Sequence, residues 1–151
     1  MNLFDHFLTT QSGLLCNVKQ RPSCEVEGIF GMSHVLVVDD SEVIRKVMGR
    51  IFEGMRCQTS QVATREEGIE ICKMALPDAI VVDWNLPGTD SPDFIREVRR
   101  LPNGKQIKIV ICTSHCSDEE RVRARAIGAD DVLLKPFDRH HIWAQFEELR
   151  S

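Results

Sequence analysis

Polar side chains with complementary chemistry stand directly after short apolar runs in this sequence. The runs 34–38, 80–82, 107–112 and 131–134 are followed by Asp39 and Asp40, Asp83, Thr113, and Lys135. Carboxylates about 4 Å apart repel each other by roughly 4 kcal/mol at an effective dielectric near 20, so such a cluster favours a bound cation. Oxygen ligands suit Mg²⁺ or Mn²⁺, whereas a lysine and a threonine hydroxyl suit phosphoryl oxygens. The set indicates transfer of a phosphoryl group to a carboxylate, with Asp83 as the candidate nucleophile.

The segments that must position these groups alternate between strand and helix patterns from His34 onward. Continuous apolar runs are typical of strands that are covered on both faces. Apolar residues at three-to-four spacing separate the runs and predict helices. This fivefold alternation predicts an α/β fold, a doubly wound parallel sheet of five strands with helices on both faces. Ligands of such folds bind at the carboxyl ends of the strands, which is where all the polar groups fall.

Capping residues mark the ends of the expected helices. Ser41 caps the first helix, Thr64 and Glu67 form a capping box for the second, and Gly54 and Gly128 suit C-terminal caps. The remaining strand, at 55–61, is polar, as expected for a sheet edge. The helices are expected at 42–53, 64–75, 91–101, 118–127 and from Asp138 onward.

Size and charge exclude several classes of protein. A chain of 151 residues is the size of one domain. No stretch approaches the ~20 apolar residues that span a bilayer, so membrane insertion is not expected. The net charge of -4 argues against direct DNA binding, which needs a basic face.

The six cysteines predict free thiols rather than disulfides or zinc ligands. No two are spaced as Cys-x-x-Cys, and three lie within apolar patterns. A zinc site at Cys112, His115 and Cys116 lacks a second cluster of ligands. Reduced thiols indicate a cytoplasmic protein.

Residues 1–32 form an N-terminal extension without a sustained period. Two interpretations stay open. The segment is a flexible tail or a mis-assigned start, because Met32 stands just before the first strand. Alternatively, it packs on the domain at 33–151 or on a partner.

The sequence from about residue 33 to 150 resembles response-regulator receiver domains of the CheY-like type. The resemblance rests on Val37-Val-Asp-Asp40, Val82-Asp-Trp-Asn-Leu-Pro87, Thr113-Ser114 and Lys135-Pro136-Phe137. It implies a flavodoxin-like sheet with strand order 2-1-3-4-5. It also implies that a histidine kinase or histidine phosphotransfer protein phosphorylates Asp83.

The resemblance further assigns roles at the site. Asp40, Asp83 and the backbone carbonyl of Asn85 would hold Mg²⁺ or Mn²⁺, with Asp39 assisting. Thr113 and Lys135 would bind the phosphoryl group, and the bond from Lys135 to the following proline is expected to be cis.

Three positions depart from the family pattern. Val132 stands where the family usually has an aromatic residue, so rotation of an aromatic ring cannot report a shift of Thr113. Ser91 replaces a common glycine. His115 occupies a position that in this family helps to set how fast the acyl phosphate hydrolyses.

The favoured hypothesis is a stand-alone phosphorylation switch, not an enzyme, that signals to an unknown downstream protein. A kinase is expected to dock on the first helix through Val43 and Ile44. One alternative is a receiver-like adaptor that acts without phosphorylation. The other is a magnesium-dependent phosphatase with an aspartyl-phosphate intermediate, although Asn85 stands where such an enzyme needs a second acid.

Overall fold

The fold is a parallel five-stranded sheet with helices on both faces. The computed structural model describes residues 31–87 and 91–149, and the unit that carries the fold begins at Met32. The strand order is β2-β1-β3-β4-β5, so the predicted fold class and the order 2-1-3-4-5 are both confirmed. The predicted extension, residues 1–32, lies outside the described residues except for its last two. The strands are β1 His34–Val38, β2 Gln58–Val62, β3 Ala79–Asp83, β4 Lys108–Thr113 and β5 Asp131–Leu134.

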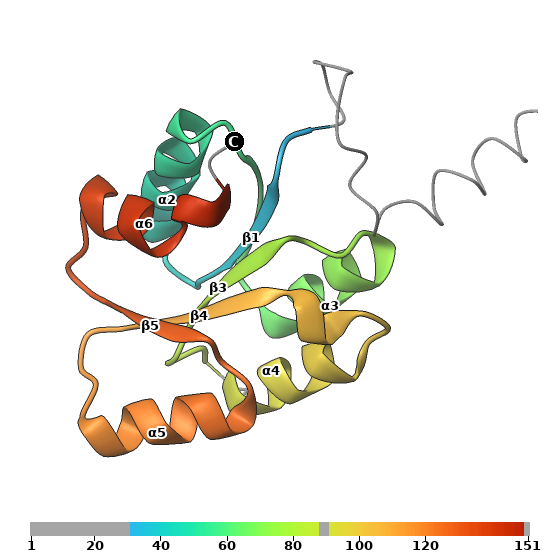
Figure 1. Ribbon diagram of the computed structural model, residues 1–151, viewed down its shortest axis with the longest axis vertical. Coiled ribbons are helices and arrows are strands. Elements are labelled where there is room, and N and C mark those ends of the chain that lie inside the picture. The colour runs from blue at the N-terminus through green and yellow to red at the C-terminus, as the bar shows by residue number, and fades with distance from the viewer. Residues whose placement is uncertain (1–30, 88–90, 150–151) are drawn as a thin grey trace, which may run out of the picture. The chain divides into compact units, whose positions relative to one another are not determined.

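Five α-helices connect and cover the strands. Helices α2 and α6 lie on one face of the sheet, and α3, α4 and α5 lie on the other (Figure 1). The helices are α2 Glu42–Gly54, α3 Arg65–Met74, α4 Ser91–Arg100, α5 Asp118–Ile127 and α6 Arg139–Gln145, with 3-10 turns η1 Gly104–Gln106 and η2 Glu147–Leu149. No described helix combines the length and the apolarity needed to cross a bilayer.

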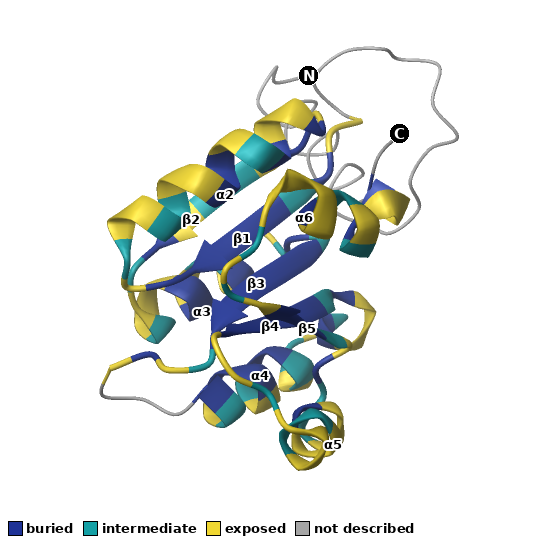
Figure 2. Cartoon of the chain, turned by 90° about the vertical axis from the view of Figure 1, so that its left-hand side faces the viewer, coloured by how far each residue is buried: buried dark blue, intermediate teal, exposed yellow. Residues whose placement is uncertain are grey.

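Each central strand divides its side chains between two apolar cores. In β1, Leu36 and Val38 point to the core beneath α3, α4 and α5, whereas Val35 and Val37 point to the core beneath α2 and α6. The strands β1, β3 and β4 are accordingly buried along almost their whole length (Figure 2). Burial on both faces explains why these strands read as continuous apolar runs rather than alternating ones.

Most of the predicted helix caps are confirmed. Thr64 accepts from the backbone N–H of Glu67, but the Glu67 carboxylate accepts from the Thr64 hydroxyl and not from its backbone N–H, so the predicted capping box is only half formed. Gly128 adopts φ 112° and closes α5 as expected. Gly54, predicted to cap the first helix, is instead its last helical residue, and Arg56 takes the left-handed conformation at φ 60°. The prediction was wrong because Met55 and Cys57 are both buried, which places the turn at the exposed residue between them.

In the edge strand β5, the backbone N–H and carbonyl of Val132 both form hydrogen bonds with side chains. The side-chain amide of Gln145 donates to the Val132 carbonyl at 2.8 Å. The Val132 N–H donates to the carboxylate of Asp131, also at 2.8 Å.

Candidate phosphoryl-acceptor site

The pairing of β1 with β3 places the predicted acidic residues together. Val38 pairs with Val82, so Asp39 and Asp83 leave neighbouring strands at the same level. Carboxylate oxygens of Asp39, Asp40 and Asp83 lie within 4.8 Å of one another. Asp39 and Asp83 are 1% and 6% exposed, whereas Asp40 is exposed. The site is thus a buried pair of carboxylates with a third at its entrance.

Lys135 provides the positive charge that faces this pair. Its Nζ lies 3.1 Å from the carboxylate of Asp39 and 3.6 Å from that of Asp83. The neighbouring strand β4 fixes the position of Lys135, because the Lys135 backbone N–H donates to the carbonyl of Thr113 at 2.7 Å. Burial works to lower the pKa of Lys135, but the two carboxylates outweigh it and raise that pKa. The bond from Lys135 to Pro136 is cis, as the resemblance implies.

The carboxyl group of Asp83 experiences opposing influences. Burial raises its pKa above the ordinary value. The backbone N–H of Asn85, which donates to Asp83 Oδ1 at 3.2 Å, and the charge of Lys135 both oppose this, whereas Asp39 adds to it. Because burial and repulsion prevail, the anionic form of Asp83 is less favourable in this site than in water. A positively charged or electrophilic group beside the carboxylate is therefore favoured.

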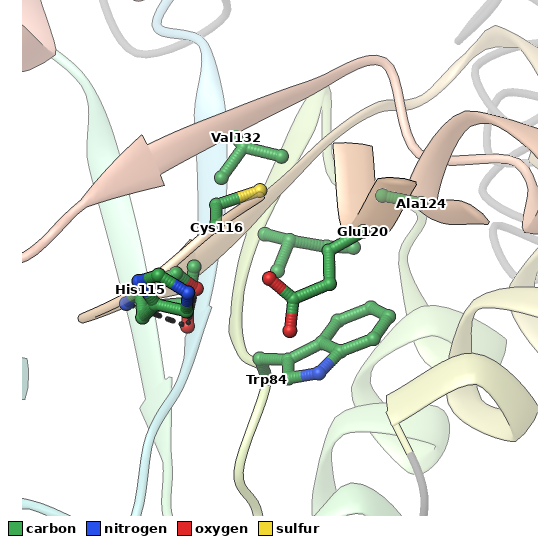
Figure 3. Close-up of a pocket in the computed structure, with 8 residues that line it drawn as sticks. Trp84, His115, Cys116, Glu120, Ala124 and Val132 are labelled. Carbon is green, nitrogen blue, oxygen red and sulfur yellow. Dashed lines mark hydrogen bonds between the residues drawn. The ribbon is translucent and has the colours of Figure 1, made fainter. Parts of the chain in front are cut away.

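Thr113 ends β4 on the other side of Asp83. It is buried, and its Oγ1 donates to the carbonyl of His115 at 2.9 Å. A cavity opens beyond it, between Trp84 of the β3 end and Val132 of β5, with Glu120 and Ala124 of α5 along one side (Figure 3).

The donor set at the entrance fits a divalent cation. Asp39, Asp40 and Asp83 supply hard oxygen atoms close enough to share one ion, and the described residues contain no other such group of acidic, histidine or cysteine side chains. Oxygen-only ligands with room for waters match Mg²⁺ better than they match zinc. That the backbone carbonyl of Asn85 completes the set stays a prediction.

The comparison with known families agrees with this geometry. Residues 35–147 match the family model described as the response regulator receiver domain. The chain belongs to this family. It is therefore a receiver domain of a two-component signalling system, and the family is one of phosphoacceptor signalling domains.

Individual relatives of this receiver domain support the same assignment. The PhoB phosphate regulon transcriptional regulatory proteins of Escherichia coli and Rhizobium meliloti are 30% and 28% identical over 113 and 115 residues. The alignments cover 75% and 76% of this chain but only 49% and 51% of those proteins, so the chain spans about half the length of these relatives. CheY4 of Vibrio cholerae, a chemotaxis response regulator, superposes with a TM-score of 0.74 at 27% identity, covering 78% of this chain and 98% of that one.

Two residues at the receiver site were missed by the sequence reasoning. Ser91 was noted only as a departure, yet its buried hydroxyl contacts the carbonyls of Asp83 at 2.6 Å and Trp84 at 2.8 Å. Arg45 of α2 donates to the carbonyl of Asp39 at 2.7 Å. The available signal for Arg45 was its place one helical turn after the cap Ser41, on the side of α2 that starts beside Asp39.

Proposed function

We propose that this receiver domain accepts a phosphoryl group on Asp83 from a histidine kinase or a histidine phosphotransfer protein and then signals through protein–protein contacts. The observation that carries the proposal is the buried carboxylate of Asp83 with the ammonium of Lys135 3.6 Å away. A buried carboxylate next to a fixed cation is suited to attack an anionic phosphoryl group, because the cation offsets the charge of the incoming oxygens.

The transfer forms one bond and breaks one bond. An oxygen of Asp83 bonds to phosphorus, and the bond between phosphorus and the donor's histidine nitrogen breaks. That nitrogen keeps the electron pair and takes up a proton. Lys135 and the hydroxyl of Thr113 hold the phosphoryl oxygens, and the burial of Asp83 limits access of water to the acyl phosphate.

Asp39, Asp40 and Asp83, with the carbonyl of Asn85, would hold Mg²⁺ or, in its place, Mn²⁺. A divalent cation there supplies positive charge that offsets the charge on the phosphoryl oxygens. The protein's own contribution is to hold Asp39 in place, through Lys135 and through the backbone N–H of Ser41, which donates to Asp39 Oδ1 at 2.8 Å.

The exposed side of α2 is the proposed docking surface for the phosphodonor protein. Val43 and Val47 are 69% and 41% exposed and one helical turn apart, on the helix that begins two residues after Asp40. Ile44, also predicted to contact the kinase, packs partly against the apolar core, so its substitution would disturb the fold as well. Val43→Glu should slow transfer from a cognate kinase, while Met74→Glu, at an 81% exposed position of α3, should not. Equal rates in wild type and Val43→Glu would reject this surface.

The phosphorylation itself is tested by intact mass. Wild type, Asp83→Asn and, as a matched control, Asp93→Asn are incubated with Mg²⁺ and acetyl phosphate. One phosphoryl group on wild type and Asp93→Asn, and none on Asp83→Asn, supports the proposal. Continuous release of inorganic phosphate would indicate the phosphatase, and no adduct from acetyl phosphate or a cognate kinase would indicate the adaptor.

The output of the domain depends on what the native protein contains. The two PhoB proteins named above are transcriptional regulators in which the matching segment makes up about half of the chain, whereas the match covers 98% of the CheY4 chain. Action as a stand-alone switch on another protein therefore stays a prediction. The mass of the protein isolated from its source tests it.

A further inference from the structure

Ser91, the first residue of α4, contacts the backbone on both sides of the peptide that follows Asp83. Its side chain is buried, and its Oγ donates to the Asp83 carbonyl at 2.6 Å and to the Trp84 carbonyl at 2.8 Å. Both distances are those of hydroxyl–carbonyl hydrogen bonds, so one hydroxyl hydrogen is shared between two acceptors. The start of α4 is thereby attached to the end of β3.

Each of these carbonyls belongs to a planar peptide unit whose N–H also forms a hydrogen bond. The Asp83 carbonyl shares its plane with the Trp84 N–H, which donates to the Cys112 carbonyl of β4 at 2.9 Å. The Trp84 carbonyl shares its plane with the Asn85 N–H, which donates to Asp83 Oδ1 at 3.2 Å. Because a peptide unit is rigid, a hydrogen bond that fixes its carbonyl also fixes the direction of its N–H.

The second of these peptide units connects Ser91 to the carboxylate of Asp83. The Ser91 hydroxyl binds its carbonyl end, and Asp83 Oδ1 accepts from its N–H end. The ammonium of Lys135 lies 3.6 Å from the same oxygen. Two donors from different strand ends therefore face Oδ1, and together they restrict rotation of the carboxylate about its last torsion, which is otherwise soft.

We propose that Ser91 is a positioning residue for phosphoryl transfer: its hydroxyl directs the Asn85 N–H to Asp83 Oδ1 and so holds the carboxylate in the orientation that attacks phosphorus. The proposal rests on the phosphorylation of Asp83. A nucleophile that is oriented in advance reacts faster with a bound donor, and its orientation contributes nothing to the binding of that donor. Ser91 acts through the peptide between Trp84 and Asn85 and not by contact with the phosphoryl group.

Phosphorylation kinetics of the full chain test this role. Intact mass follows adduct formation on wild type and Ser91→Ala with Mg²⁺ over a series of acetyl phosphate concentrations. The maximal rate should fall by about tenfold in Ser91→Ala. The concentration that gives half the maximal rate should change by less than about twofold, because Lys135 and Thr113 are unaltered. Ser91→Gly, which removes the whole side chain and introduces no clash, should behave in the same way.

The amide of Asn85 reports the link directly, without metal or phosphodonor. Solvent exchange of single amides is measured by NMR in wild type and Ser91→Ala. The Asn85 amide should exchange about fivefold faster in Ser91→Ala, because its peptide is no longer fixed at the carbonyl end. The Trp84 amide, which donates to the Cys112 carbonyl, serves as the internal reference and should change by less than about twofold.

A matched control lies in the same helix. Ile95 of α4 is fully buried, and Ile95→Val removes one methylene group from the core and lowers stability without touching the carbonyls at the end of β3. This variant should keep the maximal rate and the exchange rate of the Asn85 amide. A tenfold slower rate in Ile95→Val would show that any loosening of α4 slows the transfer, which overturns the positioning role.

The outcomes separate this proposal from the function on which it rests. An unchanged maximal rate in Ser91→Ala overturns the positioning role and leaves the phosphoacceptor function intact. A slower rate without faster exchange at Asn85 shows that the serine does not act through this peptide, and it overturns the proposal as well. If neither acetyl phosphate nor a cognate kinase phosphorylates wild type, the proposed function and the positioning role are both rejected.

Discussion

Lys135 donates a hydrogen bond of 3.1 Å to the carboxylate of Asp39. A lysine from the end of β5 therefore neutralises a buried side chain that the proposed metal would also need. An ammonium and a divalent cation compete for the same carboxylate charge. The charge on Lys135 should consequently weaken metal binding even though it favours phosphorylation.

Removal of this charge tests that competition. Lys135→Met should bind Mg²⁺ more tightly, by about fivefold or more, and should accept a phosphoryl group more slowly, by about tenfold or more. Calorimetric titration with Mg²⁺ and the rate of adduct formation with acetyl phosphate measure the two effects. Lys46→Met, at an exposed lysine of α2 that pairs with Glu42, is the control and should change neither. Weaker Mg²⁺ binding in Lys135→Met would mean that Lys135 organises the acidic group instead of competing for it.

The exposed member of the acidic group allows metal binding to be separated from folding. Asp40 is exposed, so Asp40→Asn should leave the free energy of unfolding within about 0.5 kcal/mol of wild type. Mg²⁺ affinity should fall by about tenfold or more, because one of three anionic ligands is lost. Calorimetric titration and urea unfolding without metal measure these quantities. Unchanged affinity would exclude Asp40 as a ligand.

The raised pKa of Asp83 predicts that its contribution to the free energy of unfolding depends on pH. Burial is the main cause, and between the ordinary carboxyl pKa and the raised one the folded state holds more protons than the unfolded state. The contribution of Asp83 to the free energy of unfolding therefore falls as the pH rises through that window. In a metal chelator at about pH 7, Asp83→Asn should be more stable than wild type.

The advantage of Asp83→Asn should disappear below the ordinary carboxyl pKa, where Asp83 is protonated in both states. Urea unfolding across this pH range measures it. Asp93→Asn, at an exposed residue of α4, serves as the control. A variant less stable than wild type at neutral pH would show that the pairing of Asp83 with Lys135 outweighs its burial.

His34 predicts a pH dependence of the opposite sign. Burial lowers its pKa below 6.5, against the opposing charge of Asp78, and its Nε2 forms a hydrogen bond of 2.8 Å with Ser60. The unfolded state takes up a proton first as the pH falls, so stability is lost as the pH falls from the ordinary value to the lowered one. His34→Gln should remove this part of the pH dependence of thermal unfolding. The same change at the exposed His140 should keep it, and an unaltered profile in His34→Gln would contradict the assignment.

The hydroxyl of Ser91 should stabilise the start of α4. It is 1% exposed and lies 2.6 Å from the carbonyl of Asp83. Ser91→Ala leaves that buried bond unmade and should lower the free energy of unfolding by about 1–2 kcal/mol. Ser114→Ala, at an exposed serine, should change it by less than about 0.5 kcal/mol. Denaturant unfolding measures both variants, and equal effects would show that the buried bond contributes nothing special.

The sequence predicted those features that depend on strand position. Burial on both faces makes each inner strand apolar, and sheet register alone carries Asp39, Asp83 and Lys135 to one edge, so these residues could be found from order and pattern. The bond of Thr113 to the His115 carbonyl depends on a loop conformation and a rotamer that leave no period in the sequence. The same holds for Ser91.

The misplaced C-terminal cap of α2 has a different cause. Glycine is the usual residue for a left-handed turn, so Gly54 was the natural choice from sequence. Burial of Met55 and Cys57 decides the position instead, and that burial belongs to the packing of the whole domain.

The occupied backbone of Val132 affects how this protein behaves at high concentration. Unpaired N–H and C=O groups of an edge strand are a template onto which other chains add strands and aggregate. At the β5 edge, Gln145 and the carboxylate of Asp131 take both groups of the central position, and the strand is only four residues long. An incoming strand would have to displace both side chains before it could pair. Strand addition at the centre of the β5 edge is therefore hindered.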